Sequence, residues 1–302
     1  MAKYILLAAK ISTTFENYLR SKNYLFCTSE NDIEKNEIEG IVTSNKLVLD
    51  KDKIAAFEHL KWIARLGSGM EIIDTEFCKE KNIFCFSSPQ GISNAVAEHV
   101  LGMLIGLQKN IATSFIELKN KQWIREPNRG FELQEQVLGI IGYGNTGKAV
   151  AQKFQGLCKK ILVYDKYKIS TDAFVQHCSL EELQKNATVI SFHLPLNEET
   201  VHYYNEDFAN KCQQHILINT SRGEIVSNEI LLKNLASKKI LGACLDVLEN
   251  EKELTNSTSL HWHFVEELLN YKVILTPHIA GYSFDAIEKM SHELQEQLEK
   301  IV

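Results

Sequence analysis

The most informative segment of the chain is Val137-Leu-Gly-Ile-Ile-Gly-Tyr-Gly-Asn-Thr-Gly147. Its first five residues predict a buried β-strand, and Gly142, Gly144 and Gly147 then fit the pattern G-x-G-x-x-G. A helical window over 146–157 follows, so backbone N–H groups at a helix start could hold a pyrophosphate. Chance glycines in a turn are the competing interpretation, and the strand–loop–helix context favours dinucleotide binding.

An acidic residue supports the same interpretation. The apolar run Ile161–Tyr164 predicts the next strand, and Asp165 follows it, 23 residues after Gly142. A carboxylate at this place accepts hydrogen bonds from ribose hydroxyls and repels a 2′-phosphate. The sequence therefore favours NAD over NADP.

Alternating apolar strands and helical windows predict an α/β chain with parallel, doubly wound sheets. From residue 137 onward the expected strands are 137–141, 161–164, 188–192, 215–219, 241–244 and 273–275. Before residue 90 they are 4–9, 40–43, 62–66 and 83–86. One long helix is expected from about 95 to 121, after a break at 87–91, and the last helix should bury a stripe of residues 284, 287, 290, 294, 298 and 301 against the N-terminal part.

Length and charge narrow the functional classes. The 302 residues suggest two domains, and a net charge of −6 gives no positive field for nucleic acid or anionic membranes. The apolar run 100–107 is too short to span a bilayer, and residues 1–10 look like a strand and not a signal peptide. Seven cysteines without a C-x-x-C pair suggest reduced structural thiols in the cytoplasm.

Three polar residues follow successive strands. Arg222, Glu251 and His278 should face one site, because ligands bind outside the carboxyl ends of parallel strands. An arginine fork matches a carboxylate, and a histidine beside a glutamate can carry a proton near neutral pH. Each residue alone is ordinarily a solvated or structural one. Together, in a dinucleotide-binding sheet, they suggest an active site.

The ordered set of sequence blocks resembles the D-isomer-specific 2-hydroxyacid dehydrogenases over nearly the whole chain. The blocks are Leu60–Gly69, Ala95–His99, Gly130–Leu133, Leu138–Gly147, His193–Thr200, Asn219–Gly223 and Thr276–Gly281. The resemblance implies two Rossmann-like or flavodoxin-like domains, with an NAD domain (95–281) inserted into a discontinuous substrate domain (1–94 plus 282–302). It also implies a homodimer formed through the NAD domain.

By this resemblance Arg222, Glu251 and His278 are the catalytic Arg, Glu and His. The implied cofactor-binding residues, besides the three glycines and Asp165, are Ser68, Asn145, Thr146, Leu194, Pro195, Thr220 and Asp246. The implied substrate-binding residues are Arg65, Ser68, Gly69, Met70 and Arg222. After Glu251 the family usually has Pro, whereas this chain has Lys252. The nearby His261-Trp-His263 has no evident third ligand, so no metal is expected.

The resemblance leaves the 2-hydroxy acid open. Short bacterial 3-phosphoglycerate dehydrogenases are the most similar subgroup, but they commonly have Arg where this chain has Thr43, so Lys46 or Arg65 would have to bind the phosphate. The alternative is a glyoxylate or hydroxypyruvate type of reductase. Formate dehydrogenases are similar in fold, but the resemblance to them is disfavoured because they share a Gln at the position where this chain has Glu251.

A non-enzymatic alternative is an NAD-sensing binding module, as in the C-terminal-binding corepressors, which keep the same Arg, Glu and His. The absence of basic or disordered tails counts against it. Turnover of 2-oxo acids would separate the two functions.

Overall fold

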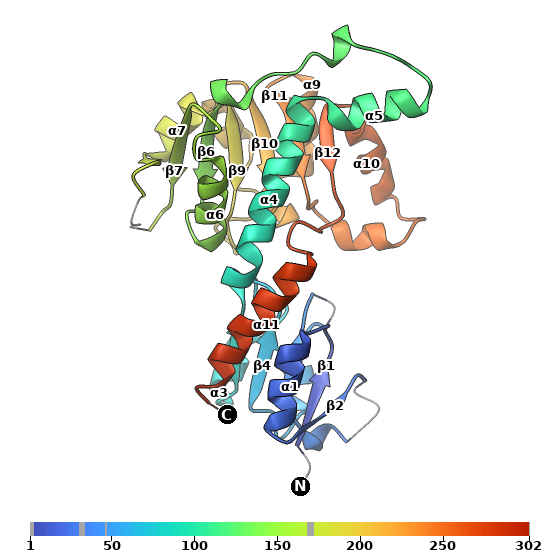
Figure 1. The fold of residues 1–302 in the computed structure, drawn as a ribbon, viewed down its shortest axis with the longest axis vertical. Coiled ribbons are helices and arrows are strands. Elements are labelled where there is room, and N and C mark those ends of the chain that lie inside the picture. Colours follow the sequence, from blue (N-terminus) through green and yellow to red (C-terminus); the bar gives the residue numbers. More distant parts are fainter. Residues whose placement is uncertain (1–2, 30–33, 46, 168–171, 302) are drawn as a thin grey trace. The chain divides into compact units, whose positions relative to one another are not determined.

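The computed structural model describes residues 3–29, 34–45, 47–167 and 172–301. The chain forms two compact units, each with its own parallel sheet (Figure 1). Unit 1 comprises Met1–Ala95 and Gly281–Val302, and unit 2 comprises Val96–Ala280. These bounds lie within one residue of those expected from the sequence.

Unit 1 has a five-stranded parallel sheet in the order β2-β1-β3-β4-β5. Its strands are β1 (Lys3–Leu7), β2 (Tyr24–Cys27), β3 (Ile38–Thr43), β4 (Trp62–Arg65) and β5 (Phe84–Ser87). Its helices are α1 (Thr13–Ser21), η1 (Lys35–Glu37), α2 (Lys51–Ala55), α3 (Thr75–Glu80) and α11 (Phe284–Leu298). Strand β2, a short strand at the edge of the sheet, was not predicted from the sequence.

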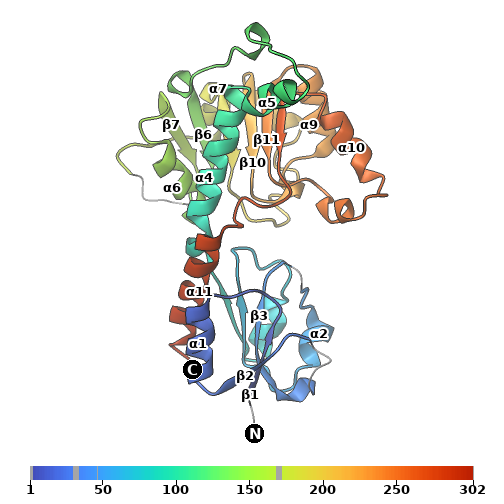
Figure 2. The ribbon, with the colours of Figure 1, turned by 45° about the vertical axis from the view of Figure 1, so that its right-hand side comes forward.

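Helices cover both faces of this sheet (Figure 2). On one face α1 and α11 share a core that includes Trp62 of β4, and Met290, Leu294 and Leu298 of α11 are buried in it. On the other face α2 and α3 contribute to a second core. The expected packing of the last helix is therefore confirmed, with two corrections. Phe284 is 86% exposed because it is the first residue of α11, and Ile301 is 37% exposed because the helix ends before it, at Leu298.

Unit 2 has a seven-stranded parallel sheet in the order β12-β11-β10-β9-β6-β7-β8. Its strands are β6 (Val137–Ile141), β7 (Lys160–Tyr164), β8 (Gln176–His177), β9 (Val189–Phe192), β10 (His215–Asn219), β11 (Ile240–Leu245) and β12 (Val273–Leu275). Its helices are α5 (Ile111–Lys119), η2 (Glu126–Asn128), η3 (Leu133–Glu135), α6 (Asn145–Phe154), α7 (Leu180–Asn186), α8 (Glu206–Lys211), η4 (Gly223–Ile225), α9 (Asn228–Ala236), η5 (Glu251–Thr255) and α10 (His261–Leu268). Helix α4 (Pro89–Gln108) contains the boundary between the units.

The strand order of unit 2 reverses between β6 and β9, which are neighbours although β7 and β8 come between them in sequence. Such a reversal is the ligand-binding switch point of doubly wound sheets. The six expected strands are present, and the two-residue β8 is additional.

The single helix expected from 95 to 121 is wrong. The chain forms α4 and α5, separated at Asn110, whose left-handed backbone (φ 52°) ends the regular helix. Helix α4 also begins earlier, at Pro89, inside the expected break. Proline is tolerated in a first helical turn because the N–H group that it lacks would have no helical partner there.

Candidate active site

The glycine loop joins β6 to α6 at the switch point. Gly142 has a left-handed backbone (φ 91°), and a Cβ there would lie 2.3 Å from the carbonyl oxygen of His193. A Cβ at Gly147 would lie 2.0 Å from the carbonyl oxygen of Gly142. Both positions therefore require glycine for reasons internal to the protein.

Gly144 differs from these two glycines. Apart from its chain neighbours, no atom of the described residues lies within 4 Å of the position that its Cβ would take. Gly144 is the N-cap residue of α6, and glycine has no side chain that could cap the helix. The first backbone N–H groups of α6, including those of Asn145 and Thr146, therefore receive no hydrogen-bond acceptor from the N-cap side chain. Helix N-termini of this kind bind phosphate through backbone N–H groups.

Asp165 connects the end of β7 to the glycine loop. Its Oδ2 accepts from the backbone N of Tyr143 at 2.8 Å, and its Oδ1 accepts from Tyr167 N at 2.9 Å. The carboxylate has further lone pairs that could accept from ribose hydroxyls. Asp165 thus lies beside the glycine loop, at the position predicted from the sequence for a ribose partner.

The segment after β9 closes against the same loop. Leu194 Cδ2 lies 3.1 Å from the position of a Gly142 Cβ, and the Pro195 carbonyl accepts from Thr200 Oγ1 at 2.6 Å. His193 Nε2 contacts Ser191 Oγ at 2.8 Å, and burial lowers the pKa of His193 to about 4. The His193 ring is therefore uncharged at pH 7.

Asn219, the last residue of β10, organises the loop that carries Arg222. Its Oδ1 accepts from the backbone N (3.1 Å) and Oγ (2.8 Å) of Ser221, and its Nδ2 donates to the Arg222 carbonyl at 2.8 Å. Arg222 Nη1 donates to the Ser221 carbonyl at 2.7 Å. Within the described part of the chain, the buried Oγ1 of Thr220 has no hydrogen-bond partner, so it is available to a ligand.

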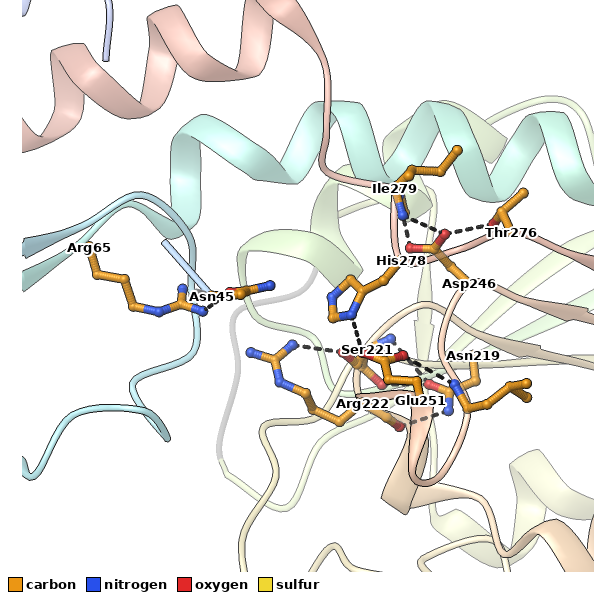
Figure 3. A network of polar contacts seen from close by, with 12 residues as sticks. Asn45, Arg65, Asn219, Ser221, Arg222, Asp246, Glu251, Thr276, His278 and Ile279 are labelled. Carbon is orange, nitrogen blue, oxygen red and sulfur yellow. Dashed lines mark hydrogen bonds and ion pairs between the residues drawn. The ribbon is translucent and has the colours of Figure 1, made fainter. Parts of the chain in front are cut away.

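Asp246 is the buried anchor of the segment that carries His278 (Figure 3). Its carboxylate accepts from Thr276 Oγ1 at 2.6 Å and from the backbone N of Ile279 and Ala280, both at 2.8 Å. Its carbonyl accepts from His278 N at 2.8 Å. A buried carboxylate is costly unless its oxygens are satisfied, and these contacts satisfy it.

His278 and Glu251 form an ion pair between Nδ1 and Oε1 (Figure 3). The hydrogen bond to Glu251 is the main cause that raises the pKa of His278. Burial opposes the rise, Asp246 adds to it, and the charge of Arg222 lowers it. His278 also has a left-handed backbone (φ 55°), which is uncommon for a residue other than glycine. The structure thus brings Arg222, Glu251 and His278 together at the carboxyl ends of β10, β11 and β12.

The expected substrate residues of unit 1 lie at the end of β4 and in the loop that follows it. Arg65, 3% exposed at the end of β4, donates from Nη2 to Asn45 Oδ1 (Figure 3). Ser88 Oγ accepts from Gly67 N at 3.0 Å and donates to the Arg65 carbonyl at 3.2 Å. These contacts hold the loop with Ser68, Gly69 and Met70, in which Ser68 is exposed.

Several organising residues were not singled out from the sequence. They are Asn45, Ser88, His99 and Asn219; His99 Nε2 contacts Thr276 Oγ1 at 2.9 Å. Asn219 carried a signal, since it is a polar residue that closes an apolar strand. Among the described residues, no group of three or more His, Cys, Asp or Glu could hold a metal ion, and no helix is long and apolar enough to cross a membrane.

Comparisons with known proteins agree with this geometry. Residues 101–280 match the family described as D-isomer specific 2-hydroxyacid dehydrogenase, NAD binding domain. The chain belongs to this family. It is 33% identical over 291 residues to a hydroxypyruvate reductase of Thermotoga maritima, covering 93% of this chain and 92% of that protein. It is 32% identical over 259 residues to an (S)-sulfolactate dehydrogenase of Chromohalobacter salexigens, covering 84% and 81%.

Solved structures give the same result. The D-lactate dehydrogenase of Aquifex aeolicus, complexed with NAD and lactic acid, superposes with a TM-score of 0.85 at 27% identity, covering 98% of this chain and 94% of that one. The chain is therefore an NAD-dependent D-2-hydroxyacid dehydrogenase, an oxidoreductase acting on CH–OH donors. The open space at Gly144, the unpartnered Thr220 hydroxyl and the acid at Asp165 fit NAD.

Proposed function

We propose that this dehydrogenase reduces a small, unphosphorylated 2-oxo acid, of the hydroxypyruvate or glyoxylate type, with His278 as the proton donor. The observation that carries the proposal is the His278–Glu251 ion pair beside Arg222 at adjacent strand ends. Such a site needs an anion anchor and a proton carrier, and Arg222 and His278 are suited to those two roles.

NAD supplies the hydride acceptor or donor. Glu251 holds Nδ1 of His278 and favours the imidazolium, so Nε2 is the ring nitrogen left to give its proton to the carbonyl oxygen. The planar guanidinium of Arg222 can bind the substrate carboxylate in bidentate fashion. The substrate-binding roles of Arg65, Ser68, Gly69 and Met70, and the cofactor-binding role of Ser68, are part of the same proposal. So are the cofactor-binding roles of the unit 2 residues: Gly142, Gly144, Asn145, Thr146, Gly147, Asp165, Leu194, Pro195, Thr220 and Asp246.

Two observations favour a small acid over 3-phosphohydroxypyruvate. A phosphate needs more cationic partners than a small acid does, yet Thr43 is uncharged and fully buried, and one Nη atom of Arg65 is already bound to Asn45. Lys46, the other cation considered for this role, lies outside the described residues. The second observation is the 33% identity to a hydroxypyruvate reductase over nearly the whole chain.

The test is a panel of hydroxypyruvate, glyoxylate, pyruvate and 3-phosphohydroxypyruvate, with NADH oxidation followed by absorbance. We expect the highest kcat/KM with hydroxypyruvate or glyoxylate, and the D enantiomer as product where the product is chiral. Preference for the phosphorylated acid would contradict the substrate and support phosphoglycerate dehydrogenase. NADH binding without turnover of any acid would support the binding-module alternative.

We also propose that the protein is a homodimer assembled through unit 2. Helix α5 and the chain after it expose a series of large apolar side chains: Ile111 (53%), Phe115 (62%), Ile116 (57%), Trp123 (81%) and Phe131 (66%). Large exposed apolar patches mark interaction surfaces, and a second copy would bury this one. Light scattering should give twice the chain mass, and Phe115→Lys with Trp123→Lys should give a monomer. A monomeric wild type would contradict the proposal.

The compartment is a further proposal. All seven cysteines are free, and five of them are buried, which supports a reducing environment such as the cytoplasm. Thiol titration of the unfolded protein, purified without reductant, should count seven thiols. A lower count would contradict the proposal.

A further inference from the structure

A second histidine–carboxylate pair involves the loop that carries Glu251. His202 Nε2 contacts Glu249 Oε1 at 2.6 Å, and Glu249 Oε2 accepts from Asn228 N at 3.2 Å. His202 follows β9, Asn228 begins α9, and Glu249 lies between Asp246 and Glu251 after β11. One carboxylate thus connects the segments that follow three neighbouring strands.

The same segments are in close backbone contact. His202 N donates to the Glu224 carbonyl at 2.7 Å, and Glu224 lies two residues after Arg222. A Cβ at Gly223 would lie 2.0 Å from the Leu248 carbonyl oxygen, so η4 lies directly against the loop 248–251. The Glu251 carboxylate accepts from Leu248 N at 3.3 Å. The position of Glu251 therefore depends on the backbone that Glu249 ties down.

This pair differs from the histidine–glutamate pairs on the surface. The side chains of His263 and Glu266 are 77% and 71% exposed and lie three residues apart on α10. The side chains of His202 and Glu249 are less exposed, at 45% and 22%, and the two residues are 47 positions apart in sequence. His202 keeps a left-handed backbone (φ 50°) in this place, a conformation uncommon for residues other than glycine.

We propose that Glu249 and His202 are positioning residues for catalysis, which fix the loop carrying Glu251 and the turn after Arg222 so that both face His278. The inference rests on the proposed function of His278 and Glu251. Neither residue touches His278, whose charged neighbours are Glu251, Asp246 and Arg222.

The contacts of Glu249 with His202 and with Asn228 N are called the clamp. Removal of the clamp should weaken the Glu251–His278 hydrogen bond, because loop 248–251 then loses the contacts that hold it in place. The pKa of His278 then falls. Reduction needs protonated His278, so the rate is full below this pKa and is lost as the pH rises through it. The decline of kcat at high pH should therefore move to lower pH.

The experiment compares Glu249→Ala and His202→Asn with the matched surface variants Glu266→Ala and His263→Asn. Asparagine tolerates the left-handed backbone of His202 but is too short to replace Nε2. We expect kcat to fall about tenfold in the clamp variants, with NADH affinity unchanged and the high-pH decline shifted down. Glu249→Gln, which keeps an acceptor for Asn228 N, should restore most of the wild-type profile.

A second readout is independent of turnover: the His278 ring is titrated by NMR in the wild type and in Glu249→Ala. A lower His278 pKa in the variant is expected. An unchanged His278 pKa, or an unchanged pH profile, would overturn the positioning role even if the variant melted at a lower temperature. If the wild type turned over no 2-oxo acid, the proposed function would fail. The NMR titration would still show whether Glu249 and His202 position Glu251 against His278.

Discussion

The carboxyl ends of the two parallel sheets are built with opposite chemistry. In unit 2, strand-end loops are held by carboxylates that accept backbone N–H groups, as Asp165 and Asp246 do. In unit 1, the corresponding loop is held by a neutral hydroxyl, Ser88, next to the buried cation Arg65. The carboxylates of unit 2 can therefore raise the pKa of a histidine at its strand ends. The described strand ends of unit 1 have no carboxylate–histidine pair.

The largest effect should come from the proton carrier of unit 2. His278→Ala should lower kcat for 2-oxo acid reduction by about 10³-fold, because general acid catalysis is lost. NADH affinity should stay at the wild-type value, since the glycine loop is intact. Steady-state kinetics and a fluorescence titration of NADH measure the two quantities. Turnover within a factor of two of the wild type would show that proton transfer does not depend on His278.

The next effect concerns the carboxylate anchor. Asp246→Ala removes the acceptor for Thr276 Oγ1 and for two backbone N–H groups, so we expect the free energy of unfolding of unit 2 to fall by about 3 kcal/mol. Chemical denaturation followed by circular dichroism measures it. Activity should fall as well, because this segment carries His278.

The matched change in unit 1 is Ser88→Ala, which removes from a fully buried position a neutral hydroxyl that accepts from Gly67 N and donates to the Arg65 carbonyl. We expect a loss of about 1 kcal/mol in the same denaturation experiment. Equal losses in the two variants would mean that charge makes no difference to how the two strand-end loops are held.

A more specific effect should separate two glycines of the same loop. Gly144→Ala places its methyl group in open space, so stability should stay unchanged while the Kd for NADH rises about tenfold. Gly147→Ala places a methyl group 2.0 Å from the Gly142 carbonyl and should destabilise unit 2 by about 2 kcal/mol. Wild-type NADH affinity in Gly144→Ala would contradict the phosphate-binding role of the loop.

The sequence predicted the features that depend on local pattern. Strand β6, the glycine loop and Asp165 were found because a buried strand, a tight turn and an acid have fixed spacing. The break of the long helix at Asn110 was missed, because the apolar pattern continues through it and only the left-handed backbone ends it. Strand β8 was missed because two residues carry no periodicity.

The site followed the same division. Arg222, Glu251 and His278 could be singled out as candidates because each comes shortly after the carboxyl end of a strand of the same parallel sheet. The contacts that hold them in place could not, because they join residues far apart in sequence. Glu249 and His202 are 47 residues apart, and Asp246 reaches Ile279 across 33.

The most direct test of the central claim is the pH dependence of kcat for 2-oxo acid reduction in wild type and Glu251→Gln, at saturating NADH. Glu251 raises the pKa of His278, so the wild type should keep full activity up to a higher pH than the variant. The account predicts a decline at high pH that moves to lower pH in Glu251→Gln and disappears in His278→Ala. Superimposable profiles for wild type and Glu251→Gln would contradict it, because Glu251 would then not control the proton on His278.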